Sequence, residues 1–355
     1  MISVSVILPC YNMKDYIDQC MDSLINQTLK NIEIILVNDA SQDCTLEILR
    51  RYEKQHENVI VIDSPINLKQ GGARNLGMDI AKGKYIGFVD PDDWINGTMY
   101  EKLYHFAEEN NYEFVKCYHS RVQKIFNNVN TVTLGNDASI IDFTEPKNSA
   151  VYKKLSDVRY AGFAIWDSIF DREFLAANKI RFPEHVFHED AYFSFFTDYF
   201  ASRKGTFKEV LYYYLLRYNS TESKRNDISS CENLLTSIRM LLKEITAREI
   251  LDKDKDKIEE YFINRYYVAS YTTILNFDTP PAEFLKNLSK LILRYFPDYQ
   301  KNKYCIEGTE LHKTILQILR LNDIDPLCLC NTIQEDEELR TFIHEYASIG
   351  GTRSL

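Results

Sequence analysis

Three carboxylates lie within four residues at the point where an apolar segment ends. The segment Tyr85–Val89 is typical of a buried strand, and Asp90, Asp92 and Asp93 follow it directly. Open α/β sheets bind their ligands beyond the carboxyl ends of the strands. Carboxylates so close repel one another, and a divalent cation between them relieves the repulsion. We therefore expect Mg²⁺ or Mn²⁺, which usually bind substrate phosphates, although a solvated acidic turn before a helix is an alternative.

Three earlier apolar segments also lead into residues that can bind a ligand. Pro9 and Tyr11 follow the first segment, Asp39 follows the second, and Gly72 and Arg74 lie beyond the third. Because the carboxyl ends of parallel strands lie side by side, these residues and the acidic group can line one crevice. Each has a structural alternative, since paired glycines mark turns and a helical arginine is usually solvated or salt-bridged. Their joint occurrence favours a binding site.

Strands and helices alternate over the first 117 residues. Apolar segments typical of strands cover residues 4–8, 32–37, 59–62 and 85–89. The intervening segments carry apolar residues at helical spacing. This alternation predicts an α/β fold with a doubly wound, mainly parallel sheet and right-handed crossovers.

The pattern changes twice beyond residue 117. Residues 119–160 indicate strands and a mobile loop, and residues 161–218 return to ordered helices and strands. From residue 227 onwards, apolar stripes at helical spacing continue along the chain. We therefore predict one domain over residues 1–226, made of the halves 1–117 and 118–226, and a helical C-terminal domain over residues 227–355.

Composition excludes several classes of protein. The net charge of −10 over 355 residues argues against a general nucleic-acid binder, which would carry a basic surface. No segment approaches 18 apolar residues and the N-terminus has no basic leader, so we expect a cytoplasmic protein without a membrane-spanning helix. The eight cysteines are scattered without a CxxC pair, which indicates reduced thiols and no structural zinc.

The strand-end motifs, taken in order, resemble a known family. They are Pro9–Asn12, Val37–Ser41, Gly71–Asn75 and Asp90–Trp94. Their order and spacing are similar to the nucleotide-sugar half of the family-two inverting glycosyltransferases, which have the A-type glycosyltransferase fold. Trp166 and the pair Glu189 and Asp190 resemble the acceptor-side pattern of the same family. The resemblance covers roughly residues 1–222 and implies that the chain is a glycosyltransferase.

The resemblance implies how the nucleoside of a UDP-sugar is bound. The Tyr11 ring would pack on the uracil face, and the backbone near Pro9 would bond to its edge. Asp39 would accept a hydrogen bond from the uracil N–H. Asp90 would hold the ribose.

The resemblance also implies how the diphosphate is bound. Asp92 would ligate the Mn²⁺ or Mg²⁺ that bridges the phosphates, with Asp93 beside it. Gly72 belongs to the same donor-binding motif, and Arg74 would donate to phosphate or sugar. The metal would stabilise the charge of the leaving diphosphate, an effect worth several kcal/mol at the transition state.

The acceptor side needs a general base. In this family it is the second member of a Glu-Asp pair, which implies Asp190. The base would take the proton of an acceptor hydroxyl that attacks from the face opposite the diphosphate, and such attack inverts the anomeric configuration. Glu189 and His188 would orient the acceptor, and Trp166 would stack on a sugar ring.

Structural roles compete with these assignments. Taken alone, Asp190 favours a helix cap, Asp39 can cap the helix near Asp43, and Trp166 fits a core as well as a sugar site. Many relatives carry aspartate at the position of Asn38 and glycine at that of Ala40. These departures retain the residue implied for uracil binding and leave the donor sugar open.

We therefore expect a metal-dependent inverting glycosyltransferase that moves a sugar from a UDP-sugar to a glycan or lipid-linked glycan in surface polysaccharide synthesis. The amphipathic stripes of the helical domain leave three partners open: the inner membrane face, where the protein would bind peripherally, the acceptor, or a second copy in a homo-oligomer. Two other classes remain. A nucleotidyltransferase would more often carry a basic, glycine-rich loop near its N-terminus, and a non-catalytic nucleotide- or glycan-binding module would need neither a metal ligand nor a base.

Overall fold

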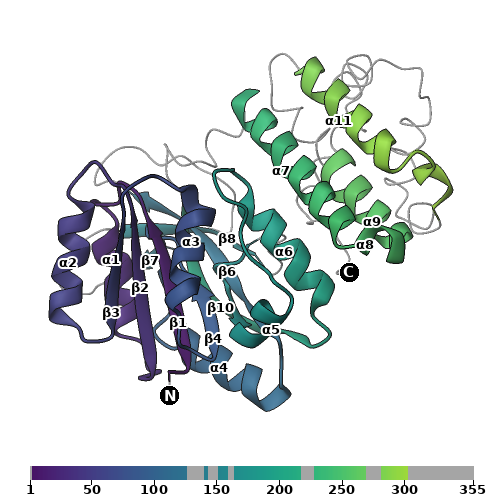
Figure 1. The fold of residues 1–355 in the computed structure, drawn as a ribbon. Coiled ribbons are helices and arrows are strands. Elements are labelled where there is room, and N and C mark those ends of the chain that lie inside the picture. Colours follow the sequence, from purple (N-terminus) through teal and green to yellow (C-terminus); the bar gives the residue numbers. More distant parts are fainter. Residues whose placement is uncertain are drawn as a thin grey trace. The chain divides into compact units, whose positions relative to one another are not determined.

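The computed structural model divides the chain into two compact units, Met1–Ser220 and Thr221–Leu355. The structure describes residues 2–125, 140–142, 151–158, 164–216, 228–268 and 281–302. Within the described part of the chain, no helix combines the length and apolarity that crossing a membrane requires. The two units are shown in Figure 1.

The first half of the first unit alternates strands and helices as the sequence predicts. Its elements are β1 (Val4–Cys10), α1 (Ile17–Ile25), β2 (Ile32–Asp39), α2 (Thr45–Gln55), β3 (Val59–Ser64), α3 (Lys69–Ile80), β4 (Tyr85–Phe88), β5 (Trp94–Ile95) and α4 (Met99–Asn110). β1 and β2 are buried along their whole length, as expected for central strands covered on both faces.

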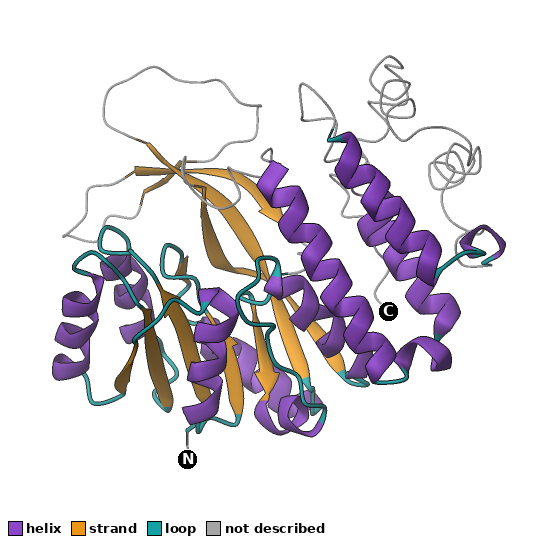
Figure 2. Cartoon of the chain, turned by 45° about the horizontal axis from the view of Figure 1, so that its top comes forward, coloured by secondary structure: helices purple, strands orange, loops and turns teal. Residues whose placement is uncertain are grey.

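The second half of this unit contributes the remaining strands. They are β6 (Phe114–Ile125), β7 (Ile140–Asp142), β8 (Val151–Val158), β9 (Ser168–Asp171) and β10 (Lys204–Leu216), with α5 (Arg172–Ala177) and α6 (Glu189–Phe200) between β9 and β10. All of these strands join one continuous sheet with those of the first half (Figure 2).

The sheet is mixed, and its largest parallel part is formed by β1 to β4. The strand order is β3-β2-β1-β4-β9-β6-β10-β5, and β8 with β7 pairs beside β6. The pairs β3-β2, β2-β1, β1-β4 and β6-β10 are parallel. β9 runs antiparallel between β4 and β6, and β5 runs antiparallel beside β10. The predicted doubly wound, mainly parallel sheet is confirmed, whereas β5 and the direction of β9 were not anticipated.

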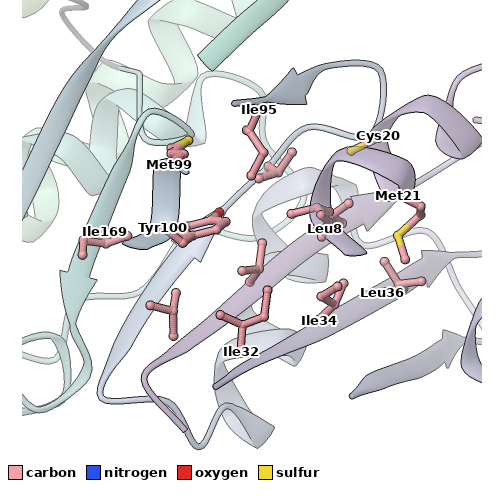
Figure 3. Packing of buried hydrophobic residues seen from close by; sticks show 14 of the residues in the cluster. Leu8, Cys20, Met21, Ile32, Ile34, Leu36, Ile95, Met99, Tyr100 and Ile169 are labelled. Carbon is pink, nitrogen blue, oxygen red and sulfur yellow. The ribbon is translucent and has the colours of Figure 1, made fainter. Parts of the chain in front are cut away.

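Successive residues of a strand face opposite sides of the sheet, so apolar residues of one strand can pack against helices on both faces. Val4, Val6 and Leu8 of β1 belong to a core cluster with residues of α1 and α4, such as Met21 and Tyr100 (Figure 3). On the other face, Ile7 meets α3 so closely that a Cβ on Gly77 would lie 2.4 Å from its Cγ2. The side chains of β1 are thus enclosed from both sides, which fixes the position of its carboxyl end.

The second unit is helical in its described part. It contains α7 (Ile228–Ala247), α8 (Ile250–Lys253), α9 (Lys255–Phe262), a π-helical turn (Ile263–Val268), α11 (Ala282–Tyr295) and a 3₁₀ turn (Tyr299–Lys301). The sequence beyond residue 227 carries four apolar stripes at helical spacing, and three of them lie on α7, α9 and α11, whose buried residues include Ile238, Ile258 and Leu288. The fourth stripe, between residues 311 and 319, lies outside the described residues.

Candidate active site

The carboxyl ends of β2, β1 and β4 meet at one edge of the sheet. β1 pairs with both neighbours, with Cys10 opposite Asn38 and Ile7 opposite Phe88. Residues that follow these strands therefore share one edge, as the sequence predicted for Asp39, Tyr11 and the acidic group.

Loop residues at this edge adopt left-handed backbone conformations. Their φ angles are 54° at Asn12, 59° at Ala40, 64° at Lys69, 61° at His185 and 62° at His188. Such conformations are unfavourable for residues other than glycine and concentrate where a loop must present a ligand-binding group. The φ angle of Ala40 is one that glycine adopts without strain.

Tyr11 and Asp39 present different chemistry at this edge. Tyr11 is 39% exposed, which leaves its ring accessible, while Pro9 contributes backbone from the buried strand β1. Asp39 is buried, and its Oδ1 accepts a hydrogen bond of 2.7 Å from the Leu68 amide. Burial raises the pKa of the Asp39 carboxyl, and the amide bonds and the charge of Lys69 oppose the rise. Asp39 therefore anchors the loop before α3 and does not cap α2, where Asp43 accepts from Thr45 instead.

The three acidic residues after β4 have three different environments. Asp93 is buried, and its two oxygens accept from the Tyr212 hydroxyl at 2.6 Å and the Leu215 amide at 2.8 Å. Asp92 is half-buried. The Asp90 carboxylate binds the guanidinium of Arg74. We predicted Asp93 beside the metal, but the structure turns it toward β10, where it fixes the acidic loop to the sheet.

The acidic loop creates a negative potential around it. Burial raises the pKa of Asp93, and the charges of Asp92 and Asp90 raise it further. Burial likewise raises the pKa of the Cys10 thiol, with added contributions from Asp90 and Asp92. Excess negative charge at this point suits a cation.

Arg74 is fully enclosed and joins two distant segments. Its Nη2 donates to Asp90 Oδ1 at 2.8 Å and its Nη1 to Glu189 Oε1 at 2.6 Å, while its Nε has no hydrogen-bond partner. The side chain is 2% exposed. The sequence predicted that Arg74 would donate to phosphate or sugar, but both terminal nitrogens donate to carboxylates of the protein.

The glycines of α3 serve close packing. A Cβ on Gly71 would lie 2.4 Å from the carbonyl oxygen of Pro183, and one on Gly72 would lie 2.5 Å from the Cβ of Leu68. Asn75 exchanges two hydrogen bonds with the Phe182 backbone, at 2.9 and 3.0 Å. Gly72, predicted to bind the donor, thus lets the loop before α3 fold against the helix.

The start of α6 carries the predicted general base. His188 occupies the N-cap position without a side-chain cap bond, and Glu189 and Asp190 form the first turn. Asp190 is half-buried, and its Oδ1 accepts from the Ala191 amide at 2.8 Å. Glu189 is buried on Arg74, which differs from its predicted role of orienting an acceptor. Burial raises the Glu189 pKa, while Arg74 opposes the rise.

Trp166 lies in an aromatic stack. Its ring lies 4.3 Å from that of Tyr212 and 5.5 Å from that of Tyr214, at interplanar angles of 27° and 16°. The centroid of the His119 ring lies 4.6 Å from that of Trp166 in an edge-to-face arrangement, and His119 Nδ1 lies 3.2 Å from Asp167 Oδ2. Trp166 remains half-buried, so its predicted stacking on a sugar stays a prediction.

Tyr212 is the site residue that the sequence did not identify. It receives the amide hydrogen of Asp90 at 3.2 Å and donates to Asp93, so it holds the acidic loop at both ends. Tyr212 is the first of three consecutive tyrosines on β10. Tyr212 pairs with Ile95 of β5, a strand that is two residues long and gives no sequence signal of its own.

The donor set at this edge fits a metal ion that is completed by its substrate. Among the described residues, no group of three His, Cys, Asp or Glu side chains could enclose an ion. Arg74 binds Asp90 and β10 binds Asp93, and the half-buried Asp92 carboxylate lies in the same acidic loop. A Mg²⁺ or Mn²⁺ ion held by one or two carboxylates, with phosphate oxygens as further ligands, matches this arrangement.

Comparisons with known proteins agree with the fold and the motifs. The family model described as "Glycosyl transferase family 2" matches residues 5–172. A poly(ribitol-phosphate) beta-glucosyltransferase of Bacillus spizizenii is 32% identical over 303 residues, which are 81% of this chain and 44% of that relative. The chain thus spans less than half the length of this relative. The putative glycosyltransferase EpsH of Bacillus subtilis is 31% identical over 264 residues, 73% of this chain and 72% of EpsH.

A solved structure has the same fold. Residues 1–349 of S. aureus TarS, crystallised with UDP-GlcNAc, align with 98% of this chain and 92% of that chain. The TM-score is 0.53 and the sequence identity 20%. The likeness supports the A-type arrangement of the sheet.

Proposed function

The chain belongs to glycosyltransferase family 2, and from that premise we propose that it transfers a sugar from a UDP-sugar to a hydroxyl of a glycan acceptor, with inversion at the anomeric carbon. One observation carries this proposal. Arg74 binds Asp90 of the acidic loop and Glu189 of the α6 start at once, which brings these two segments together and supports a single site for the proposed metal ligand Asp92 and the proposed base Asp190.

The nucleotide would lie at the ends of β1 and β2. The exposed Tyr11 ring offers a stacking surface for uracil, and the Asp39 carboxylate retains lone pairs for the uracil N–H beside the amide bond that it already accepts. The UDP-GlcNAc complex of TarS supports this choice of donor.

The diphosphate would lie beside Asp92. A divalent ion held there would supply positive charge to the leaving diphosphate. Asp90 is half-buried and keeps its second oxygen for the ribose, while the hydrogen bond between Tyr212 and Asp93 fixes the loop to β10. The negative potential of the loop supports a cation over a direct phosphate contact.

The Asp190 carboxylate would take the proton of the attacking hydroxyl. Because the preceding Glu189 is bound to Arg74, the first turn of α6 is fixed beside the acidic loop. A base of this kind accelerates such transfers by about 10²–10⁴-fold.

The acceptor would be a cell-surface polymer or a lipid-linked glycan. The names of the relatives support this class, since one glucosylates poly(ribitol phosphate) and another, GgaB of Bacillus subtilis, is a minor teichoic acid biosynthesis protein. Peripheral membrane binding and self-association through the helical unit stay predictions.

A binding panel tests the proposal. UDP, UDP-GlcNAc, UDP-glucose and GDP are added with and without Mn²⁺, and the melting temperature is measured. A ligand at 100 times its Kd adds about 2.7 kcal/mol to the free energy of unfolding. We expect uridine nucleotides to stabilise the protein in a Mn²⁺-dependent manner and GDP to have no effect.

Two variants assign the roles. Asp92→Ala should lose the Mn²⁺-dependent stabilisation, whereas Asp190→Asn should keep it and lose UDP release from the UDP-sugar. Stabilisation by a nucleoside triphosphate with pyrophosphate release would instead indicate a nucleotidyltransferase. Donor binding without any UDP release, with or without acceptor, would indicate a binding module.

A further inference from the structure

Arg74 joins two segments that carry different halves of the proposed reaction. Its guanidinium lies between Asp90, which follows β4, and Glu189, which begins α6. The exposed fractions of the three side chains are 2%, 17% and 5%. The ion pairs are thus sheltered from water, where charge-assisted hydrogen bonds are strong and directional.

The arginine projects from a helix that is itself fixed. α3 packs against the segment that leads into α6, with Gly71 allowing the Pro183 carbonyl to approach and Asn75 bonding to the Phe182 backbone in both directions. The Phe182 ring lies 5.4 Å from the Arg74 guanidinium carbon. Arg74 therefore projects from a helix whose position is fixed, and its two carboxylate partners must adapt to the position of its guanidinium.

Glu189 sets the rotation of α6. Successive residues of an α-helix point about 100° apart around its axis. With Glu189 turned inward to Arg74, Asp190 points to a neighbouring direction, where it is half-buried and its Oδ1 accepts from the Ala191 amide. A turn of the helix that released Glu189 would carry Asp190 away from that direction.

We propose that Arg74 is a positioning residue of the transfer reaction: by holding Asp90 and Glu189 together, it fixes the direction of the Asp190 carboxylate relative to the donor loop. The proposal rests on the function proposed above and replaces the expected contact of Arg74 with phosphate or sugar. It predicts that Arg74 affects the rate, through Asp190, far more than the affinity for UDP, which it influences only through the one oxygen of Asp90 that it binds.

A double-mutant cycle tests this prediction. Arg74→Lys keeps a positive charge but lacks the planar fork that reaches two carboxylates. We expect Arg74→Lys to slow UDP release from UDP-glucose or UDP-GlcNAc on the order of 10²-fold, the cost of a misplacement of about 1 Å. The Kd of UDP with Mn²⁺ should change by less than about twofold, since a lost transition-state interaction lowers kcat alone. In the Asp190→Asn background the same substitution should have no further effect on the rate.

A matched control separates this role from general packing. Arg181 also joins α3 to the same segment, through an ion pair of 2.6 Å with Asp79, but both side chains are about half exposed. Arg181→Lys should leave the rate and the UDP affinity unchanged. If Arg74→Lys does not fold, Glu189→Gln replaces it, because glutamine keeps the acceptor oxygen for Arg74 without the charge.

The outcomes are distinct. A loss of UDP affinity in Arg74→Lys as large as the loss of rate, or an equal loss of rate with and without Asp190, overturns the positioning role in favour of a donor contact or a purely structural one. Full activity of both Arg74→Lys and Glu189→Gln overturns it as well. If Asp190→Asn alone releases UDP at the normal rate, the assignment of Asp190 as the base is wrong. This single variant therefore tests the proposed function separately from the role of Arg74.

Discussion

Asp39 is a buried carboxylate whose pKa is raised by its burial. If it accepts a hydrogen bond from uracil, protonation removes its charge and weakens that bond. We predict that UDP affinity falls as the pH is lowered, and that the fall begins at a higher pH than an ordinary aspartate would give. Isothermal titration with UDP and Mn²⁺ measures the affinity, and Asp39→Asn should bind weakly without this pH dependence. An unchanged affinity in Asp39→Asn would contradict the assignment.

The same residue makes a prediction for stability. Because the pKa of Asp39 is higher in the folded than in the unfolded protein, the folded state binds this proton more tightly. The contribution of Asp39 to the free energy of unfolding is fully present below the pKa of about 3.8 that the carboxyl has in the unfolded protein. It is lost as the pH rises through the pKa of the folded protein. The free energy of unfolding, measured by urea titration, should therefore fall with rising pH more in the wild type than in Asp39→Asn.

Ala40 has a backbone conformation that suits glycine. Its φ angle is 59°, and a left-handed conformation costs an L-residue roughly 1–2 kcal/mol. Glycine loses about 0.5–1 kcal/mol of entropy in exchange, so Ala40→Gly should raise the free energy of unfolding by up to about 1 kcal/mol. Ala201, with φ −71°, is the matched control, and Ala201→Gly should be destabilising. Equal destabilisation of both variants in urea would show that Ala40 is unstrained.

At the scale of the elements, α3 is the part that holds the two halves of the site together. Gly71→Ala gains up to about 1 kcal/mol of helix propensity but places a Cβ 2.4 Å from the Pro183 carbonyl oxygen. Overpacking of this kind costs roughly 1–3 kcal/mol, and the segment that leads to Asp190 must move. We predict a lower melting temperature and slower UDP release, with UDP affinity affected less.

Gly97 provides the control for that substitution. A Cβ at Gly97 would lie 3.7 Å from its nearest neighbour, the carbonyl oxygen of Asn26, which is ordinary contact. Gly97→Ala should therefore leave UDP release unchanged. If Gly71→Ala is as active as Gly97→Ala, the close approach of α3 to the α6 segment has no bearing on the reaction.

The elements of this chain differ in how far the sequence predicts them. β1, β2 and β4 are continuous apolar segments that end in polar residues, so both the strands and the residues at their ends were predictable. β5 is two residues long and is defined by its pairing with β10, and β9 runs antiparallel between β4 and β6. These features depend on pairing between distant segments, which local patterns do not record.

The same limit applies to the site. The motifs identified Arg74, Asp93 and Glu189 and predicted ligand contacts for them, and the structure adds protein partners that the motifs do not specify. Arg74 and Glu189 are 115 residues apart, and Asp93 and Tyr212 are 119 apart. A motif shows that a charged residue is needed, whereas burial and the arrangement of the elements decide which group it binds.

At the scale of the whole molecule, the proposed donor site lies within one unit. The residues assigned to the donor, the metal and the base all belong to Met1–Ser220, which has its own core on the sheet. We therefore predict that a fragment of residues 1–226 folds and binds UDP with Mn²⁺ as the full chain does. The same UDP concentration should raise both melting temperatures to a similar extent, because the stabilisation depends on Kd alone. Circular dichroism provides the folding control, and a folded fragment that UDP does not stabilise would show that the helical unit completes the donor site.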